Sequence, residues 1–398
     1  MSDLKETLYE ELKLKLGLIV DGVRHEKGIF DRVLDGNNAL RRKVSSYFEG
    51  GLAPYAFVLP HGFHVGLDYR QDSPYEIVEK NGVFSVTYLG KWQADISFPT
   101  PPLFYSKTTS DGVRMKNIGN DSSSGSPDRS LVISYSTECA LTEKGKVCLF
   151  CGIERNSKLL GEDKCPALKN PRLIAETVKA AYDEGFKHIT LTGGFVPERR
   201  ELEYYLDVGE ALRAELGVAD FYGTACIGAP ADLSVIDKYK ETGFRTISFN
   251  TEVWGKQYFE IVNPGKVEMC GGYDNFIKAI EHAVDVFGKG RVRSNFVVGL
   301  QPKNVLFEGL EYLTSIGVVT VASSFHPCIG SHLEGHRSPS VDWHWDVQLR
   351  HAELLSKAGR TYEEIFYATP GRNFSHEIFQ IENGDHPAFR QAGEKLAV

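Results

Sequence analysis

The sequence predicts an α/β protein, a partial to nearly complete (β/α) TIM-like barrel preceded by a small N-terminal α+β module. From residue 130 to residue 370, apolar strand-like runs alternate with helical segments, which is the pattern of parallel strands joined by right-handed crossovers. The N-terminal module, residues 1–118, shows a helical pattern followed by short β-like runs. A polar stretch rich in Ser and Gly, residues 119–129, is expected to be a linker, and residues 371–398 a C-terminal extension.

The N-terminal module begins with helical periodicity from about residue 3 to residue 49. Its apolar face carries Leu4, Leu8, Leu12 and Leu16. Four β-like runs follow: Tyr55–Leu59, Phe63–Leu67, Tyr75–Val78 and Val83–Tyr88. The last two flank an Asn-Gly pair at 81–82, which favours a tight hairpin turn.

The barrel is predicted from strands and helices that follow each other in strict order. The strand-like runs are Leu131–Ser134, His188–Leu191, Ala219–Cys226, Arg245–Asn250, Val292–Leu300, Val318–Ser323 and a possible seventh, Ile365–Ala368. The helices between and after them are Arg172–Glu184, Glu201–Glu215, Ala231–Thr242, Tyr273–Phe287, Leu306–Ile316 and Trp345–Lys357. A doubly wound open sheet is the alternative to a barrel, and in either case chemistry is expected on the loops after the strands.

Composition limits the class of protein. The chain has 398 residues, with 45 basic against 53 acidic side chains, so its net charge of −8 gives no indication of nucleic-acid binding. No run approaches the roughly 20 apolar residues that cross a bilayer, and the start of the chain does not resemble a signal peptide. Seven unevenly spaced cysteines are typical of a reducing compartment, so we expect a cytoplasmic protein without a disulfide framework.

Three cysteines, Cys139, Cys148 and Cys151, follow the first predicted barrel strand. The Cys-x8-Cys-x2-Cys spacing is not that of a zinc ribbon, which adds a second Cys-x2-Cys or a His pair. Two thiolates on one turn suit neighbouring irons of a cluster. A thiolate triad leaves one iron of a four-iron cube without a protein ligand, and a small molecule can bind there. The other four cysteines, at 165, 226, 270 and 328, are expected to be buried or idle thiols.

Further motifs stand at the ends of later strands. Thr192-Gly193-Gly194 follows the second strand, Asn250-Thr251-Glu252 ends the fourth, and Gly299 lies at the end of the fifth. Together with the triad and Phe150, which precedes its third cysteine, these motifs resemble the radical S-adenosylmethionine (SAM) superfamily over roughly residues 130–330. The likeness is nearest to the branch of biotin synthase and lipoyl synthase.

The resemblance implies a specific chemistry. The triad would hold a [4Fe-4S] cluster whose free iron chelates SAM, and one electron from flavodoxin or ferredoxin would cleave SAM to a 5′-deoxyadenosyl radical. That radical would remove hydrogen from a small substrate in cofactor or specialised-metabolite biosynthesis. Phe150 and Gly299 would lie against the adenine, Thr192, Gly193 and Gly194 would bind the SAM amino group, and Asn250 with Glu252 would hold the ribose. Arg293 and Ser294 are expected to reach the SAM carboxylate.

The chain also departs from the family pattern. The first cysteine spacing is x8 instead of x3, and Phe195 stands where the glycine motif often ends in Glu. Arg293 stands near a position where biotin synthase has a cysteine for its second cluster, and no cysteine precedes Cys139. A second, sulfur-donating cluster is therefore disfavoured. Rearrangement, lyase chemistry, sulfur insertion and methyl transfer all stay open.

A late segment concentrates histidines near the loop after the sixth strand. The candidate substrate contacts there are His326, Cys328, His332, His336 and Arg337. Two other readings remain. One is a non-catalytic scaffold in which the triad binds zinc or an iron–sulfur cluster. The other is a metal-dependent barrel hydrolase that uses histidines between His326 and His351, with Glu334 or Asp346 as carboxylate ligands.

Overall fold

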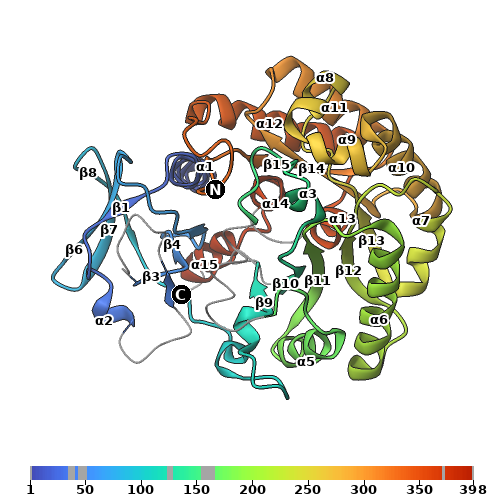
Figure 1. Cartoon of the computed structure of the whole chain (residues 1–398). Helices are drawn as coiled ribbons and strands as arrows, with labels where there is room; N and C mark the ends of the chain where they lie inside the picture. Colours follow the sequence, from blue (N-terminus) through green and yellow to red (C-terminus); the bar gives the residue numbers. More distant parts are fainter. Residues whose placement is uncertain are drawn as a thin grey trace. The chain divides into compact units, whose positions relative to one another are not determined.

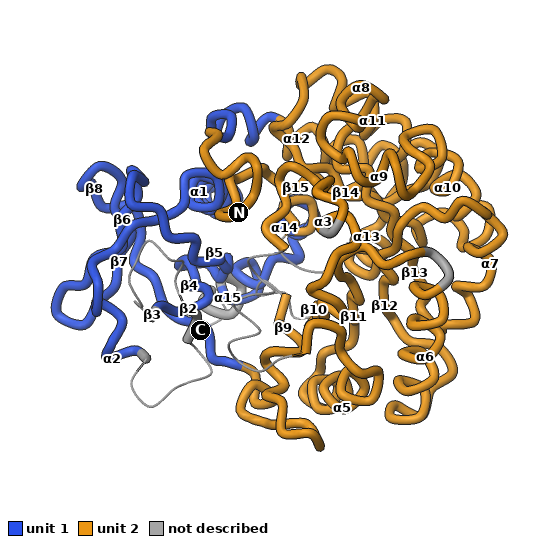
Figure 2. Tube along the Cα trace, in the orientation of Figure 1, with its two compact units in different colours: residues 1–101, 338–346, 377–398 blue, residues 102–337, 347–376 orange. Residues whose placement is uncertain are grey.

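The structure is a computed structural model that describes residues 2–34, 41–43, 52–122, 129–153, 166–369 and 373–396. The chain divides into two compact units, coloured separately in Figure 2. Unit 1 comprises residues 1–101, 338–346 and 377–398, and unit 2 comprises residues 102–337 and 347–376. No helix in the described ranges is both long and apolar enough to span a membrane.

Unit 2 is built on a curled seven-stranded sheet (Figure 1). Its order is β15-β14-β13-β12-β11-β10-β9, and every neighbouring pair from β10 to β15 is parallel. The strands are β9 (Gly119–Asp121), β10 (Arg129–Ser136), β11 (Phe186–Gly193), β12 (Phe221–Cys226), β13 (Phe244–Ser248), β14 (Val292–Val298) and β15 (Val319–Ser324). The six strands predicted with crossovers are all present, so the predicted partial (β/α) barrel is confirmed.

Helices connect the parallel strands along the chain, as the sequence predicts. They are α5 (Pro171–Tyr182), α6 (Glu198–Leu216), α7 (Val235–Lys238), α8 (Lys256–Val262), α9 (Pro264–Met269), α10 (Gly272–Phe287), α11 (Lys303–Ser315) and, after the last strand, α12 (Val341–Lys357). Local sequence sets their ends: Asn170 caps α5 with its side chain before a proline, and Gly217 ends α6 in the left-handed conformation. Helices α5 and α10 each bury one apolar face.

The possible seventh strand, Ile365–Ala368, is wrong: these residues belong to helix α13 (Tyr362–Ala368). The Thr361 side chain accepts from the backbone N–H of Glu364, and the Glu364 carboxylate accepts from the Thr361 N–H, a complete capping box that starts a helix. The carbonyl of Tyr367 accepts a hydrogen bond from His188 Nε2 on β11, and the Tyr367 ring stacks on Tyr222 of β12 with centroids 4.0 Å apart. Helix α13 therefore packs across the starts of the barrel strands.

The stretch expected to be a linker is partly regular. Strand β9 pairs antiparallel with β10, from Asp121 against Leu131 to Gly119 against Ile133. The turns η2 (Leu103–Ser106) and η3 (Met115–Asn117) precede it in unit 2. The unit boundary therefore falls after Pro101 instead of at residue 118, because this segment pairs and packs with the barrel; residues 123–128 lie outside the described ranges.

Unit 1 is a mixed α+β module. Helix α1 (Ser2–Val20) buries the predicted leucine face, with Leu8, Leu12 and Leu16 fully covered. The expected continuation of helix to residue 49 is wrong, since the described part beyond α1 holds β1 (Arg24–His25), α2 (Asp31–Leu34) and β2 (Arg41–Lys43). The remaining strands are β3 (Leu52–Pro54), β4 (Ala56–Val58), β5 (His64–Gly66), β6 (Tyr75–Lys80), β7 (Val83–Tyr88) and β8 (Lys91–Ile96).

The predicted Asn-Gly hairpin is confirmed. Lys80 of β6 faces Val83 of β7, and the two residues between them, Asn81 and Gly82, both have positive φ, at 55° and 86°. This is the backbone of the tight turn that the pair favours. Two C-terminal helices complete the described chain, α14 (Phe374–Glu382) and α15 (Pro387–Leu396). Within unit 1, Glu377 of α14 forms a buried ion pair with Lys15 of α1.

Replacing the N-cap residue of α13 tests the corrected assignment. Thr361→Ala removes the hydroxyl that accepts from Glu364 N–H, and we expect it to lower the free energy of unfolding by about 1 kcal/mol, measured by urea titration. Ser234→Ala is the matched control, because Ser234 precedes α7 without a side-chain cap and its loss should have a much smaller effect. Equal losses in both variants would contradict the capping role of Thr361.

Candidate functional site

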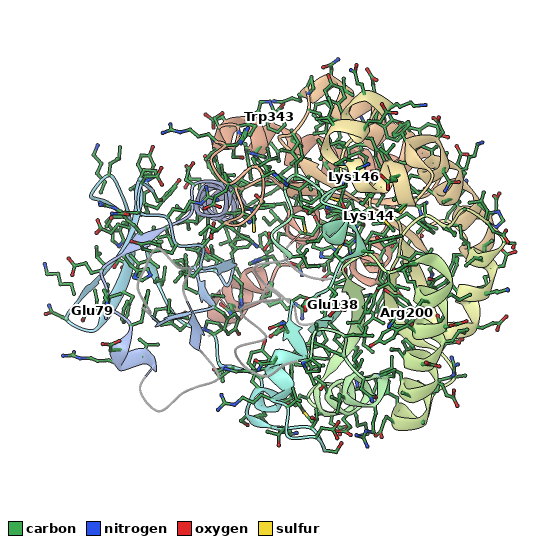
Figure 3. The ribbon with its side chains drawn as sticks, viewed as in Figure 1. Glu79, Glu138, Lys144, Lys146, Arg200 and Trp343 are labelled. Carbon is green, nitrogen blue, oxygen red and sulfur yellow. The ribbon has the colours of Figure 1, made fainter. Side chains whose placement is uncertain are left out.

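The three predicted cluster cysteines lie on one loop at the carboxyl end of β10. Cys139 precedes the short helix α3 (Ala140–Glu143), and Cys148 and Cys151 follow it. The N–H of Cys151 donates to the carbonyl of Cys148 (3.0 Å), which places the last two cysteines on a single turn. The loop is anchored by Leu149, whose N–H donates to Val262 on α8 (2.9 Å). In the same loop the exposed Lys144 and Lys146 flank Gly145, and Figure 3 shows both with Glu138.

The glycine motif after β11 packs directly on this loop. Gly194 N–H donates to the carbonyl of Ser136 (2.9 Å). A Cβ on Gly194 would stand 2.0 Å from the Glu138 carbonyl oxygen and 2.8 Å from the Cys139 Cβ, so only glycine fits. The next N–H, of Phe195, points to Cys139 Sγ at 3.3 Å. The motif thus fixes the first cysteine, and the predicted carbonyl contacts of Gly193 and Gly194 with SAM stay a prediction.

The thiols of the loop lie close enough to influence one another's ionisation. The pKa of Cys148 is raised to about 12, chiefly by burial; Lys266 opposes the rise, and the charges of Glu252, Cys151 and Cys139 add to it. Burial likewise raises the pKa of Cys151, with Cys139 among the contributing charges. Because thiolates repel each other and are poorly solvated here, Cys148 and Cys151 favour the protonated state unless a cation binds and displaces the protons.

The donor set fits an iron–sulfur cluster. The three thiols are free cysteines, and soft thiolates are the ligands that such clusters use. Within the residues that the structure describes, no three His, Cys, Asp or Glu side chains gather closely enough to share one metal ion. A four-iron cluster does not require the three cysteines to meet at one ion, because each cysteine binds a different iron. Cys165 lies outside the described residues.

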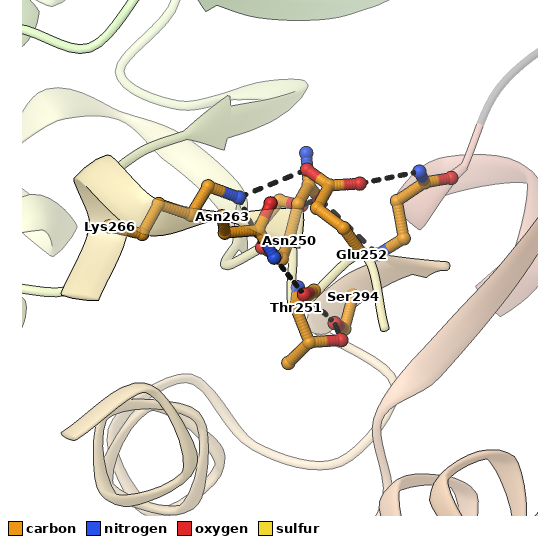
Figure 4. Close-up of polar contacts among 8 residues, drawn as sticks. Asn250, Thr251, Glu252, Asn263, Lys266 and Ser294 are labelled. Atoms are coloured by element: carbon orange, nitrogen blue, oxygen red, sulfur yellow. Dashed lines mark hydrogen bonds and ion pairs between the residues drawn. The ribbon is translucent and has the colours of Figure 1, made fainter. Parts of the chain in front are cut away.

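A second group of predicted residues forms a polar network at the end of β13 (Figure 4). Glu252 Oε1 pairs with Lys266 Nζ on α9 (3.1 Å), and Glu252 Oε2 accepts from Asn295 Nδ2 on β14 (3.1 Å). Lys266 also donates to the carbonyl of Asn250 (2.7 Å). Glu252 itself has φ of 66°, a left-handed conformation that non-glycine residues seldom adopt and that is found most often where function requires it.

Lys266 was missed by the sequence reasoning, although it is the cation on which this network is centred. Only 15% of its side chain and 9% of that of Glu252 are exposed. Burial alone would lower the pKa of Lys266, but the charges of Glu252 and Cys148 outweigh it and hold that pKa above its ordinary value. The one available signal was its place directly after Asn263-Pro264-Gly265, on the short helix that follows the Asn-x-Glu motif.

Two other predicted residues, Asn250 and Ser294, form hydrogen bonds within the protein. Asn250 Oδ1 accepts from Ser248 Oγ (2.8 Å) and from the Asn295 N–H (3.3 Å). Ser294 is fully buried, and its hydroxyl accepts from the Thr251 N–H (3.2 Å). Arg293 is adjacent in β14 and so lies on the opposite face. The sequence reasoning expected both Arg293 and Ser294 to reach the SAM carboxylate. Because their side chains point to opposite faces of β14, they cannot both do so.

Three single residues from the prediction complete the cofactor set. Phe150 is half-buried in the turn between Cys148 and Cys151. Thr192 is the last residue but one of β11, directly before Gly193, and its side chain hydrogen bonds the Cys226 thiol. Gly299 follows β14 with φ of 117°, a conformation open to glycine. Their contacts with SAM stay predictions.

The predicted substrate loop after β15 partly meets the cysteine loop. Cys328 Sγ would be 2.6 Å from a Cβ on Gly152, directly after Cys151. A pocket of about 190 Å³ lies between the two loops, lined by Cys151 and His332 with Thr142, Val147, Ile153, Gly330 and Ser331. His326, His336 and Arg337 are exposed, and none of them lines this pocket.

The late histidines do not form the metal site that a hydrolase would need. His344 belongs to unit 1, is fully buried and hydrogen bonds Ser338 (2.8 Å). His351 is also fully buried, bonds Thr320 Oγ1 (3.0 Å), and burial lowers its pKa to about 4. Both are packing histidines, so the structure does not support them as ligands beside Glu334 or Asp346.

Comparisons with known proteins found one curated relative. Over 240 residues the chain is 29% identical to a bacteriochlorophyllide c C-7(1)-hydroxylase of Chlorobaculum limnaeum, covering 56% of this chain and 59% of the relative. This similarity to an enzyme is consistent with the superfamily predicted from the sequence. The radical SAM superfamily, its [4Fe-4S] cluster and SAM stay predictions for this chain. No protein-family model matches the chain.

Solved structures similar to this chain include methylornithine synthase (PylB), with a TM-score of 0.46 and 17% identity over 62% of this chain and 68% of that one. The FeFe-hydrogenase maturase HydG from Carboxydothermus hydrogenoformans has a TM-score of 0.46 and 16% identity over 60% of this chain and 56% of its own. The curated relative is named as a hydroxylase, and the closer likeness to biotin synthase and lipoyl synthase is not supported. The chain spans about three fifths of the length of its curated relative, 59%.

Removing the cation of the Glu252 network tests its structural importance. Lys266→Met leaves the largely buried Glu252 carboxylate without its counter-charge, and we expect a loss of about 3–5 kcal/mol in the free energy of unfolding. The double variant Lys266→Met with Glu252→Gln should recover part of that loss. Lys256→Met is the control: its ion pair with Asp274 is exposed, so the urea midpoint should stay where it is. If Lys256→Met shifted the urea midpoint as much as Lys266→Met, the greater importance of the buried pair for stability would be contradicted.

Proposed function

We propose that this chain is a radical SAM enzyme that binds a [4Fe-4S] cluster through Cys139, Cys148 and Cys151. It uses the cluster and SAM to remove a hydrogen atom from a small substrate. The observation that carries this proposal is the gathering of three free thiols on the loop after the first parallel strand, in contact with the glycine motif. When bound, the cluster and SAM supply the electron transfer and the 5′-deoxyadenosyl radical.

The protein's own residues bind and orient. Gly194 brings the second strand end against Cys139, which leaves the backbone carbonyls of the motif near the position proposed for the SAM amino group. Glu252 is held at both oxygens, by Lys266 and Asn295, so its carboxylate is already oriented before a ribose arrives. Such pre-organisation lowers the entropic cost of binding. We assign Glu252 to the ribose hydroxyls on that basis.

The proposal includes a reductant, flavodoxin or ferredoxin, and a cytoplasmic, oxygen-sensitive enzyme. The cysteine loop presents the exposed cation Lys144 beside the cysteines, while the neighbouring Lys146 is paired with Glu268. Cations around the entry point of an electron would favour docking of an acidic carrier and raise the association rate at low salt. The hydroxylase similarity supports a bacteriochlorophyllide as the first trial substrate, with a hydroxylated product as the reaction to look for.

The central experiment is anaerobic. After reconstitution with iron and sulfide, the protein is given SAM and dithionite, and 5′-deoxyadenosine is measured by mass spectrometry. We expect its formation in the native protein and its loss, by at least two orders of magnitude, in Cys148→Ala, because one iron of the cluster loses its ligand. Cys270→Ala is the control, a buried cysteine outside the triad. Zinc in place of iron, together with no affinity for SAM, would identify a non-catalytic scaffold instead.

A second variant tests the contact between the glycine motif and the triad. Gly194→Ala would force its Cβ into the Glu138 carbonyl and displace Cys139, so we expect lower iron content after reconstitution and weaker SAM binding. Gly335→Ala meets nothing within 4 Å and should match the native protein in both. Iron content is determined chemically and SAM affinity by equilibrium dialysis. Normal values in Gly194→Ala would show that this close approach does not position the cluster loop.

A further inference from the structure

The inner face of the barrel sheet carries a row of polar side chains below the proposed SAM site. Cys226, Ser248 and Arg293 are consecutive partners across β12, β13 and β14, so their side chains lie on the same face of the sheet. The same face of β14 continues with Asn295, which bonds Glu252. Along β14 the residues of this face are the partly exposed ones, and those between them are buried. Arg293 therefore lies on the more open face of the sheet.

Arg293 has no protein partner among the residues that the structure describes. No hydrogen bond or ion pair of its guanidinium group is found there, and its Nε is buried without an acceptor. A buried, unsatisfied N–H on a charged group is costly, and native structures keep such groups mainly where a ligand or water completes them. The rest of the residue is partly exposed, so a ligand on this face can reach it.

The ionisable groups around Arg293 do not neutralise its positive charge. Its cation acts on His188, which is fully buried and whose pKa burial lowers to about 3, so that ring is neutral. It also acts on Cys226, whose pKa is raised by burial, so that thiol is protonated. The acid on this side of the sheet, Glu252, has one oxygen on Lys266 and the other on Asn295. The positive charge of Arg293 is left for a ligand.

The position of Arg293 along the barrel axis distinguishes a substrate from SAM as its ligand. Arg293 is the second residue of β14, two residues before Asn295, so it lies about 7 Å farther from the Glu252 network toward the starts of the strands. At that end α13 crosses the strands, since Tyr367 accepts from His188 and stacks on Tyr222. A group bound at the cysteine loop lies at the opposite ends of the strands. The position suits a molecule that occupies the barrel between SAM and α13.

We propose that Arg293 binds an anionic group of the substrate, a carboxylate, on the inner face of β14 between the Glu252 network and α13. The planar guanidinium group presents paired N–H donors that match the two oxygens of a carboxylate. The inference rests on the proposed function and names the substrate class for the same site, a carboxylic acid that enters the barrel with its acid group first.

Chemical protection of Arg293 tests the proposal without turnover. The protein with its cluster is treated anaerobically with phenylglyoxal, which modifies accessible guanidinium groups, and each arginine is followed by peptide mass spectrometry. The runs contain no anion, succinate, inorganic phosphate or SAM alone. At about ten times its dissociation constant, succinate leaves about a tenth of the sites free, so modification of Arg293 should slow about tenfold. Arg245 is the control, because it is exposed and stacks on Tyr222.

Each result of these runs supports or overturns the proposal. Slowing by succinate at Arg293 and not at Arg245 supports it. An unreactive Arg293, or equal rates with and without succinate, overturns it. Protection by phosphate with none by succinate overturns the carboxylate assignment. Protection by SAM alone with none by succinate returns Arg293 to the SAM carboxylate.

Thermal stability gives an independent readout and separates this proposal from the proposed function. Succinate should raise the melting temperature of the native protein, less so for Arg293→Lys and not at all for Arg293→Gln. The Lys variant keeps the charge without the fork and guards against a Gln variant that fails to fold. An equal rise in all three proteins would overturn the proposal. Failure of 5′-deoxyadenosine formation with succinate protection intact would count against the proposed function alone.

Discussion

The ion pair between Lys266 and Glu252 is the interaction on which the arrangement of the site depends. Two charges that are largely removed from water are stable only when each is fully paired, and here the pairing is distributed over several elements. Lys266 on α9 holds Glu252 and the Asn250 carbonyl after β13, and Asn295 on β14 holds the second Glu252 oxygen. The same cation lies near enough to Cys148 to counter its raised pKa. Lys266 thereby connects the cysteine loop with the residues that follow β13 and with β14.

The barrel interior combines this paired network with an unpaired charge farther down the sheet. A (β/α) barrel that is only a scaffold fills its interior with branched apolar side chains. Here the inner faces of β12, β13 and β14 present a thiol, hydroxyls, amides and a guanidinium group instead. Polar groups of this kind are costly unless something completes their hydrogen bonds. The cost is consistent with an interior shaped for ligands.

Most of the barrel could be predicted from the sequence, because alternation of apolar strands with amphipathic helices is a local property that each segment carries by itself. The six parallel strands and the Asn-Gly hairpin were found in this way. Ile365–Ala368 was misread because a short apolar run has no period that separates strand from helix, and the capping box of Thr361 and Glu364 decides for helix. Within the site, Arg293 and Ser294 were both expected at the SAM carboxylate, and the structure separates them, since adjacent residues of a strand point to opposite faces of the sheet.

The sequence by itself determined the chemistry that is available: three closely spaced thiols after a strand, a glycine pair, and an Asn-x-Glu motif at later strand ends. These follow from residue type and short-range spacing, which a linear pattern preserves. Only the tertiary structure decided which partners those residues have. Lys266 pairs with Glu252, which lies fourteen residues earlier in the chain. Arg293 has no acidic partner, because the strands that surround it, which are remote in sequence, place none beside it in the described residues. Charge pairing depends on distances across the fold, and no local pattern encodes those distances.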